Sequence, residues 1–357
     1  MVPAARRAVL LALALAAVRP VAAQGGPPRI HLLATGGTIS NLGGGARRTG
    51  RELAEGIPDL ARIATVTVEQ FSNVASSSVT QAMWRGLAGR IRQLQSGPEA
   101  PAGYVITHGT DTMEETAYFL SLTVGGCAPV ILTGAMRQAD WVGADGPANL
   151  RNAVRTAAAP AARGRGTLVL MNDEIFAARD VTKSNTTRVN AFTAPDAGVL
   201  GLADPDTVVF HRAPPPSAAA AGCAPPRFDL ATIGELPRVD VVYAYIGADS
   251  VPVDALVDAG ARGIVLAGVG RGGTTPAMSR ALERATRRGV TVVISNRTGS
   301  GRVGMGRGDG ERDAPESARA PTIGGTDLTP QKARILLTLA LAAGTDARAM
   351  AELFDAR

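Results

Sequence analysis

The feature that most restricts the fold of this chain is the alternation of short, mainly apolar runs with segments of helical periodicity. The apolar runs are rich in Val, Ile and Leu, as expected of strands that are buried on both faces. Such strands are typical of a parallel sheet covered by helices on each side. We expect strands at Ile30–Ala34, Val66–Phe71, Tyr104–Thr107, Val130–Thr133 and Thr167–Met171, and helices at Thr80–Gln95, Met113–Val124 and Ala148–Ala158.

A stretch rich in proline and alanine divides the chain. Residues 213–227 contain three consecutive prolines, a run of alanines and a further proline pair, a composition that packs no core. Alternation resumes after it, with strands expected at Val239–Ile246, Gly263–Ala267 and Val290–Ser295, and helices at Val253–Ala259, Pro276–Arg288 and Pro330–Ala343. We therefore predict an α/β protein with a larger N-terminal domain of mostly parallel sheet over residues 28–212, a linker over 213–236 and a smaller C-terminal α/β domain over 237–357.

The first 23 residues have the pattern of a secretory signal peptide. Arg6 and Arg7 precede an apolar run from Ala8 to Val18, and small residues follow at 21–23, where cleavage would occur. A membrane anchor is the alternative, but the run is shorter than the ~20 residues that a spanning helix needs. We expect a periplasmic or secreted protein with no stable membrane association.

The predicted leader also changes the charge balance. The formal net charge of the chain is +6, and it falls to +3 once Arg6, Arg7 and Arg19 leave with the leader, which has no acidic residue. Aromatic residues make up only 4% of the chain, and no basic run is interleaved with them. The composition therefore gives no reason to expect a nucleic-acid partner.

The cysteines and histidines form no recognisable metal-binding pattern. Cys127 and Cys223 are far apart in the sequence, and the histidines are scattered at His31, His108 and His211. We therefore expect no metal. An exported protein could join the two cysteines, but geometry rather than spacing decides this, so the sequence leaves the pairing open.

Hydroxyl and carboxylate side chains follow two of the predicted strands. Thr38 comes after a Gly36-Gly37 pair at the end of the first strand, and Thr110-Asp111 follow the third. Ligands of open α/β sheets bind outside the carboxyl ends of the strands, and glycine lets the backbone approach a ligand closely. Taken singly, the first segment could be an ordinary turn and the second a helix N-cap. Together they indicate a binding or catalytic site.

Lysine is rare in this chain and so informative. Only Lys183 and Lys332 occur, and every other cationic side chain is arginine. A buried ammonium can lose its proton, whereas guanidinium cannot, so Lys183 is a candidate for proton transfer. A solvated loop lysine is the plain alternative, and Lys332, at a predicted helix start, shows that a lysine here need not be catalytic. His108 resembles a base, but no serine or cysteine motif accompanies it.

These side chains suit acyl transfer. A threonine hydroxyl is a poor nucleophile unless a neighbour takes its proton. Thr38 is the candidate nucleophile, and Thr110 bridged to Lys183, with Asp111 orienting the lysine, could supply the proton acceptor.

The motifs that carry these residues resemble a known family. Ala34–Ile39 and Ile106–Glu115 are similar to the two signature motifs of the bacterial type II, or periplasmic, L-asparaginases of the asparaginase/glutaminase family. The similarity covers nearly the whole mature chain. It extends to Gly134–Arg137, Ala144–Pro147, Met171–Asp173, Gly268–Gly270 and Thr329–Arg334.

The resemblance implies a reaction and an assembly. Thr38 would attack the amide carbon of L-asparagine, release ammonia and leave an acyl-enzyme ester for water to cleave. The substrate-binding residues would be Ser76 and Ser77 together with Thr110 and Asp111, with Asp111 on the α-ammonium and Ser76 on the α-carboxylate. The family has no cofactor or metal. It forms homotetramers with each site between the N-terminal domain of one subunit and the C-terminal domain of its partner.

The chain also departs from the family pattern. The lid segment Asn41–Arg51 lacks the usual tyrosine, Ser77 replaces a common glutamine, Gly273 replaces a common asparagine, and no acidic residue in Gly301–Pro315 matches the one that the partner subunit usually provides. Cys127 matches one half of the family's disulfide and nothing matches the other, which implies that this disulfide is lost. The departures leave open a mixed glutaminase–asparaginase or a non-catalytic periplasmic amino-acid binding protein.

Overall fold

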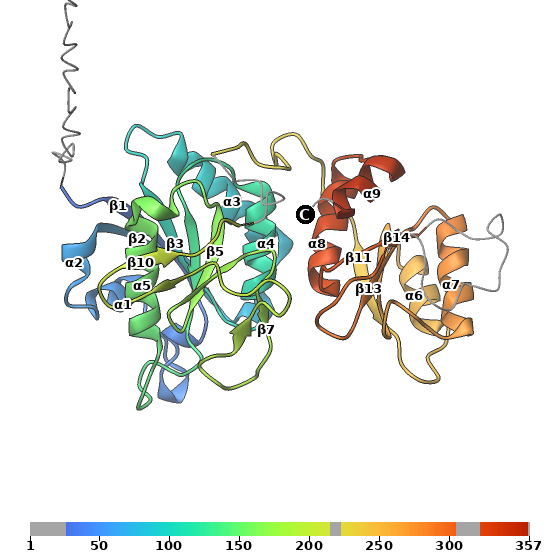
Figure 1. Ribbon diagram of the computed structural model, residues 1–357, viewed down its shortest axis with the longest axis horizontal. Helices are drawn as coiled ribbons and strands as arrows, with labels where there is room; N and C mark the ends of the chain where they lie inside the picture. The colour runs from blue at the N-terminus through green and yellow to red at the C-terminus, as the bar shows by residue number, and fades with distance from the viewer. Residues whose placement is uncertain (1–25, 215–222, 305–321, 356–357) are drawn as a thin grey trace, which may run out of the picture.

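The computed structural model describes residues 26–214, 223–304 and 322–355, which form two α/β domains lying side by side (Figure 1). The predicted signal peptide of residues 1–23 lies outside these ranges, as do residues 215–222 of the predicted linker. The architecture confirms the expected α/β fold, with a larger N-terminal and a smaller C-terminal domain.

The larger sheet of the described residues has the strand order β10-β9-β6-β5-β4-β3-β1-β2. Five neighbouring strands run parallel, as predicted, and they are β1 (Arg29–Gly36), β2 (Thr65–Val74), β3 (Gly103–Thr107), β4 (Val130–Thr133) and β5 (Thr167–Met171). Three short antiparallel strands that we did not predict extend one edge, and they are β6 (Glu174–Ala177), β9 (Gly201–Ala203) and β10 (Val208–Phe210). β6 turns back from β5 through Asn172 and Asp173, both with positive φ, which is the geometry of a two-residue hairpin.

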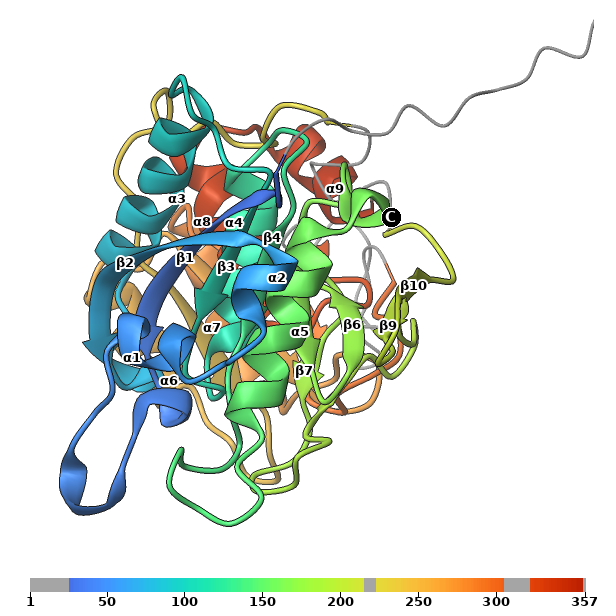
Figure 2. The same cartoon turned by 90° about the vertical axis from the view of Figure 1, so that its left-hand side faces the viewer.

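Helices cover both faces of this sheet. α3 (Gln81–Gln95) and α4 (Met113–Thr123) pack on one face against Leu33 and Ile106, while α5 (Gly146–Ala158) packs on the other against Leu32 (Figure 2). The side chains of β1 alternate between the two cores, so the strand is buried on both sides. This burial explains why the central strands are mainly apolar, whereas β2, at the edge of the sheet, carries several polar residues.

The remaining N-terminal elements are short and had no clear sequence signal. The helices are α1 (Gly50–Glu55) and α2 (Leu60–Ile63), with single 3₁₀ turns at Thr38–Ser40, Gly43–Gly45, Ser76–Ser78 and Pro160–Ala162. β7 (Thr182–Lys183) and β8 (Phe192–Thr193) pair as a two-stranded antiparallel ribbon.

The C-terminal domain is a smaller parallel sheet of order β11-β12-β13-β14 among the described residues. Its strands are β11 (Val239–Tyr243), β12 (Gly263–Gly268), β13 (Thr291–Asn296) and β14 (Ile323–Gly324). α6 (Val251–Asp258) and α7 (Pro276–Arg287) cover one face, and α8 (Pro330–Ala342) covers the other, followed by α9 (Ala347–Asp355). α8 also packs against α4, so it lies between the two domains (Figure 1). The strand expected over Val239–Ile246 ends at Tyr243, because the chain leaves the sheet there.

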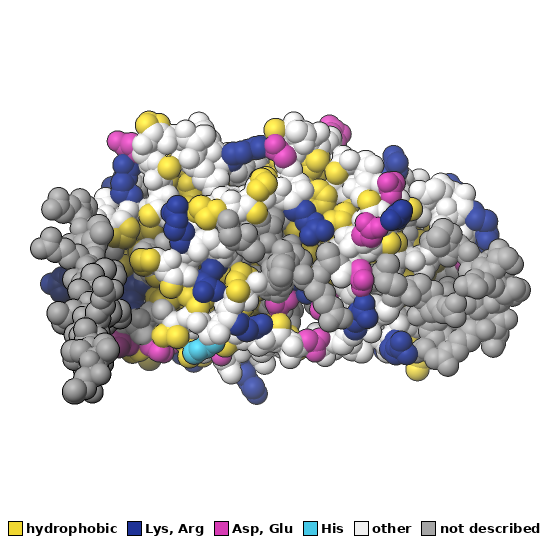
Figure 3. Space-filling model, turned by 45° about the horizontal axis from the view of Figure 1, so that its top comes forward, with side chains coloured by type: hydrophobic (Ala, Val, Ile, Leu, Met, Phe, Trp, Pro, Cys, Tyr) yellow, Lys and Arg dark blue, Asp and Glu magenta, His cyan; other side chains and the backbone are white. Residues whose placement is uncertain are grey.

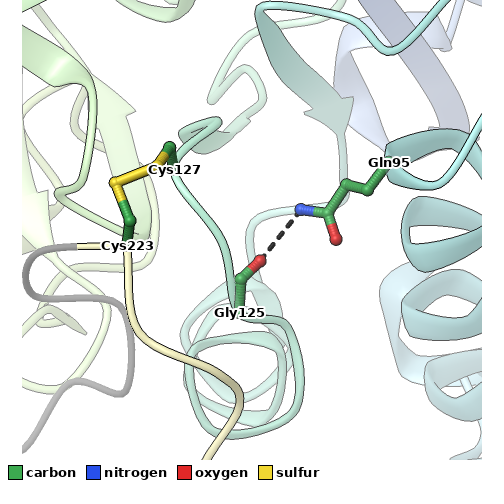
Figure 4. The surroundings of a disulfide bond; sticks show 4 residues. All are labelled: Gln95, Gly125, Cys127 and Cys223. Atoms are coloured by element: carbon green, nitrogen blue, oxygen red, sulfur yellow. Dashed lines mark hydrogen bonds between the residues drawn. A yellow bond between two sulfur atoms is a disulfide. The ribbon is translucent and has the colours of Figure 1, made fainter. Parts of the chain in front are cut away.

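A disulfide fastens the linker to the N-terminal domain. Cys127 and Cys223 are bonded, at a sequence separation of 96, which answers the question of pairing that the sequence left open (Figure 4). The linker folds back on the end of α4, where Ala224 O accepts from Gly126 N at 2.9 Å. Gln95 donates to Gly125 O at 2.9 Å on the other side. Sequence spacing could not reveal this contact because it depends on the path of the linker.

The described surface carries mixed charge. On the face shown in Figure 3, basic and acidic side chains are interspersed and do not gather into one basic patch. Within residues 26–214, 223–304 and 322–355, no helix is both long and apolar enough to cross a membrane. In the same ranges, no group of three or more His, Cys, Asp and Glu side chains is arranged to hold a metal ion.

Candidate active site

The predicted site residues follow three neighbouring strands. β1 lies between β2 and β3, and the three run parallel, so their carboxyl ends meet at one edge of the sheet. Thr38 follows β1, Ser76 follows β2 and Thr110 follows β3. The sheet therefore brings these hydroxyls to one edge, although they are far apart in sequence.

Glycines allow the three segments to touch. Gly37 has a φ of 88°, and a Cβ there would lie 2.4 Å from the backbone N and Cα of Gly109. A Cβ on Gly109 would in turn lie 2.8 Å from the Ser76 hydroxyl oxygen. Only glycine fits at either position, since real Cβ contacts are never this short. The segments that carry Thr38, Ser76 and Thr110 are therefore in direct backbone contact.

Lys183 on β7 reaches into the same edge of the sheet. Its Nζ donates to Thr110 Oγ1 at 2.9 Å and to Asp111 Oδ1 at 2.5 Å. The lysine side chain is 13% exposed, while that of Asp111 is 71% exposed. The structure thus brings Lys183 to Thr110 and Asp111, which lie 73 and 72 positions before it in the sequence. An open pocket beside them is lined by Asp111, Glu114, Lys183, Ser184, Asn185 and Thr186.

Thr38 begins a single 3₁₀ turn after the glycine pair and is partly buried. Among the described residues, its hydroxyl makes no hydrogen bond. The lid segment that follows is a small loop in which Asn41 and Arg47 pair across a turn. Gly43 N donates to Asp140 Oδ2 at 2.7 Å, so the lid is fastened to the neighbouring loop. Within the described ranges, no side chain of the lid segment forms a hydrogen bond with Thr38, so none replaces the missing tyrosine in that way.

The residues predicted to hold substrate differ in exposure. Ser76 is buried, and its carbonyl accepts from Thr112 Oγ1 at 2.9 Å, whereas Ser77 is exposed at the same turn. Gly273 lies in the C-terminal domain, where it pairs with Val269. The structure therefore does not bring Gly273 to the pocket of its own chain. The segment in which we found no match for the partner's acidic residue is Gly301–Pro315, and its residues 305–315 lie outside the described ranges.

His108 has a structural environment. The imidazole is buried, and its Nδ1 lies 2.7 Å from Gly109 O while its Nε2 lies 2.9 Å from Thr116 Oγ1. Trp84 Nε1 donates to that same hydroxyl at 2.8 Å. This network fits a neutral ring with its proton on Nδ1. Burial lowers the pKa of His108, which also favours the neutral ring. His108 thus orients the Gly109 carbonyl and lies outside the proton-transfer group.

Sequence reasoning missed Glu114. We assigned it no role of its own from the sequence, but it is buried and lines the same pocket as Lys183. Gln331 Nε2, from α8, lies 3.3 Å from its Oε1. The available signal was the mainly apolar run Ala117–Leu122 that follows it in α4, since a helix that is apolar on most of its sides is expected to be buried.

The fold and this group of hydroxyl, lysine and carboxylate define a two-domain α/β protein with a candidate acyl-transfer site. The family model described as "Asparaginase, N-terminal" matches residues 29–216, and the one described as "Glutaminase/Asparaginase C-terminal domain" matches residues 238–354. The chain therefore belongs to the asparaginase family.

Known proteins of this family are similar along most of their length. "L-asparaginase 2" of Escherichia coli is 40% identical, over 92% of this chain and 93% of its own. "Probable L-asparaginase periplasmic" of Haemophilus influenzae is 40% identical, over 92% and 93%. Among solved structures, "Probable Cytoplasmic L-asparaginase from Campylobacter jejuni" has a TM-score of 0.84 and 37% identity, covering 92% of this chain and 100% of that one.

Proposed function

We propose that the protein hydrolyses L-asparagine to L-aspartate and ammonia through an acyl-enzyme on Thr38. The observation that carries this proposal is the contact of Lys183 Nζ with Thr110 at 2.9 Å and Asp111 at 2.5 Å, beside the segment that bears Thr38. Membership of the asparaginase family, and the names of the relatives, support the choice of substrate.

The reaction proceeds in two halves. In the first, Thr38 Oγ1 attacks the side-chain amide carbon, and its proton passes through the Thr110 hydroxyl to Lys183. The C–N bond then breaks, and the leaving nitrogen takes up that proton and departs as ammonia. In the second, water attacks the resulting ester and the proton returns to Thr38. Each half needs an acceptor for one proton, and Lys183 is the proposed acceptor through the Thr110 hydroxyl. Asp111 holds the Lys183 side chain in place through the hydrogen bond between them.

The substrate's charged ends would bind opposite partners at the strand ends. Asp111 is the exposed carboxylate of the site and suits the α-ammonium. Ser76 and Ser77 begin a 3₁₀ turn beside it and suit the α-carboxylate. Thr110 then lies between the binding groups and Lys183. No metal or cofactor takes part in this scheme.

We further propose a homotetramer with each site between two subunits. The support is a set of exposed apolar side chains of the C-terminal domain, here called the exposed apolar surface, which lie in or just after β11, just after β12 and at the start of α6. Large apolar side chains that gather on the surface of a protein often mark a contact with another protein. It consists of Tyr243, Tyr245, Ile246, Val251 and Val269.

The chain organisation that goes with this function is also a proposal. A signal peptide over residues 1–23 would direct the protein to the periplasm or outside the cell, and one relative is named periplasmic while the solved neighbour is named cytoplasmic. We propose domain limits of 28–212 and 237–357, with the linker between them.

A mixed glutaminase–asparaginase is the second candidate function. The observation that favours it is Ser77, which is small and exposed at the turn proposed to bind the substrate. One methylene is worth only about 1–3 kcal/mol in a binding pocket, so mixed activity is physically easy. A non-catalytic amino-acid binding protein is the third, and the buried lysine contact with Thr110 argues against it, because binding alone requires no proton acceptor.

Ammonia release from asparagine and from glutamine by the purified protein tests these proposals. We expect kcat/KM to be higher for asparagine, and we expect Thr38→Ala to release none while keeping its circular dichroism spectrum and its mass in solution. Comparable kcat/KM values for the two amides would support the mixed enzyme. Tight binding of asparagine without turnover would support the binding protein, and full activity of Thr38→Ala would contradict the threonine mechanism.

A further inference from the structure

The second lysine of the chain lies in an unusual place. Lys332, near the start of α8, is only 1% exposed and lies between the two domains. Its Nζ donates to Arg179 O at 2.8 Å and also to Val181 O. The Lys332 ammonium also faces Glu114, whose Oε2 lies 4.0 Å from Nζ. A single ammonium from the C-terminal domain therefore contacts two separate segments of the N-terminal domain.

Both segments carry proposed active-site residues. Val181 comes two residues before Lys183 and leads directly into β7. Glu114 lies in the first turn of α4, three residues after Asp111. The ammonium of Lys332 thus links the backbone that presents Lys183 to the helix start that follows Thr110 and Asp111.

A purely structural role does not account for a lysine here. Burying an ammonium is costly, and apolar side chains of similar size commonly make such sites more stable. Apart from Thr338, the other buried side chains of α8 are apolar, so packing within this helix does not by itself require an ammonium here. Burial indeed lowers the pKa of Lys332 to about 8, despite the nearby charge of Glu114.

The surrounding contacts hold the same segment from the C-terminal domain. Arg179 Nη2 donates to Asp327 Oδ1 at 2.6 Å, and Asp327 lies in the loop just before α8. Arg179 also contacts Asp180 at 3.1 Å. The segment 179–181 is thus fixed by both a side-chain ion pair and the two carbonyl contacts to Lys332.

We propose that Lys332 is a positioning residue, which holds β7 so that Lys183 meets Thr110 and Asp111. The C-terminal domain then sets the geometry of a proton-transfer group that belongs wholly to the N-terminal domain. The expected effect of Lys332 on catalysis rests on the proposed function, whereas its effect on the position of Lys183 does not.

Kinetics of Lys332→Met and two companion variants test the catalytic part. Methionine keeps the volume but removes the donors, so β7 is released and kcat falls about 10–100-fold, as misplacement by an ångström would cause, with KM changed less than about threefold. Lys332→Arg keeps the charge and donors and restores most of kcat. The control is Leu337→Ala, which removes buried volume on the same helix facing Gly263, away from β7, and leaves kcat unchanged. Equal kcat in Lys332→Met and Leu337→Ala would overturn the proposal.

Nuclear magnetic resonance of the protein labelled with ¹³C at lysine Cε tests placement without any substrate. The chain has only two lysines, so two signals are expected, and Lys183→Arg assigns them. We expect the Lys183 signal to shift in Lys332→Met and to stay in place in Leu337→Ala. A Lys183 signal at its wild-type position in folded Lys332→Met would overturn the proposal. If the wild-type protein releases no ammonia but the shift occurs, the proposed function fails and the positioning role stands.

A titration of the wild-type protein covers the case in which Lys332→Met does not fold. As the Lys332 signal titrates, the Lys183 signal should show an inflection at the same pH, because the contacts through Val181 and Glu114 change. The charged or titratable groups that face Lys332 are Glu114, Glu115, Arg179, Asp180 and the ring of Tyr118. A Lys183 signal whose chemical shift shows no inflection at the pH where Lys332 titrates would overturn the proposal.

Discussion

The parallel strands of the two sheets share the same backbone geometry, but the side chains that follow β1 and β3 differ in kind from those that follow β11. In the N-terminal domain, polar groups such as Thr38 and Thr110 follow the strands and are held in place by glycine contacts. In the C-terminal domain, Tyr245 and Ile246 follow β11, and Ile246 is fully exposed. The first edge is suited to chemistry and the second to contact with another molecule. A parallel sheet thus fixes where a site can form, while the residues after each strand determine its use.

The strongest test of this comparison is to remove the proposed nucleophile from the carboxyl ends of the strands in the N-terminal domain. Thr38→Ala should lower kcat for asparagine by at least about 10⁴-fold, because members of a catalytic group act as a unit. The matched control is Thr65→Ala, an exposed threonine at the amino end of β2, which should keep wild-type kcat. Steady-state ammonia release measures both, and equal losses in the two variants would contradict a special role for the carboxyl edge.

The next largest effect is expected at Lys183. Lys183→Met should lower kcat by about 10²–10⁴-fold, the usual contribution of a positioned acid or base. Lys183→Arg keeps a positive charge near Asp111 but cannot accept a proton, so it should be nearly as inactive. If Lys183→Arg kept most of the wild-type kcat, Lys183 would serve as a fixed charge and not as a base.

The C-terminal edge can be tested by charge. Ile246→Asp places a carboxylate on the exposed apolar surface and should dissociate the proposed tetramer, lowering the mass in analytical ultracentrifugation and with it the activity. Val142→Asp is the control, because Val142 is equally exposed, at 101%, but belongs to an N-terminal loop. An unchanged mass for Ile246→Asp would remove the exposed apolar surface from the proposed interface.

The disulfide should affect stability and leave the chemistry intact. Cys127 follows α4, whereas Asp111 lies before it, so the bond is at the far end of that helix from the site. Cys127→Ser with Cys223→Ser should lower the free energy of unfolding in urea by about 2–5 kcal/mol, through the entropy of a long loop. kcat at low temperature should stay near the wild-type value, and a large loss of kcat in the folded double variant would show that the linker supports the site.

The smallest expected effect is a pH dependence from His108. Burial lowers its pKa in the folded state, so the unfolded chain takes up a proton first as the pH falls below about 6.5. This group therefore stabilises the fold above that pH and loses its contribution below it, by at most about 1.4 kcal/mol per pH unit. Melting temperatures from pH 7.5 to 5.5 should fall less steeply for His108→Gln than for the wild type, and identical slopes would contradict the assignment.

The sequence predicts the parallel strands and the residues at their ends, because both leave local signals. Apolar runs mark β1, β3, β4 and β5, β2 alternates apolar and polar residues at its start, and a hydroxyl after a glycine pair marks Thr38. The short strands β6, β9 and β10 leave no such signal, since their pairing depends on hairpin turns. Contacts between distant segments, such as Cys127 with Cys223, also depend on the path of the chain and not on local pattern.

The two lysines show the same limit within the site. Rarity of lysine alone marked Lys183 as a candidate, and its contact with Thr110 is what the structure adds. Lys332 is just as rare, but at a predicted helix start it served only to show that a lysine here need not be catalytic. Only the packing of α8 between the domains places it against Val181.

The most direct test of the central claim is the site of the covalent intermediate. The wild-type protein is mixed with asparagine, quenched in acid within one turnover and digested, and the peptides are analysed by mass spectrometry. We predict an aspartyl ester on the peptide that carries Thr38, with none in Thr38→Ala. An ester on the peptide that carries Thr110, or turnover of asparagine by Thr38→Ala, would contradict the assignment of Thr38 as the nucleophile.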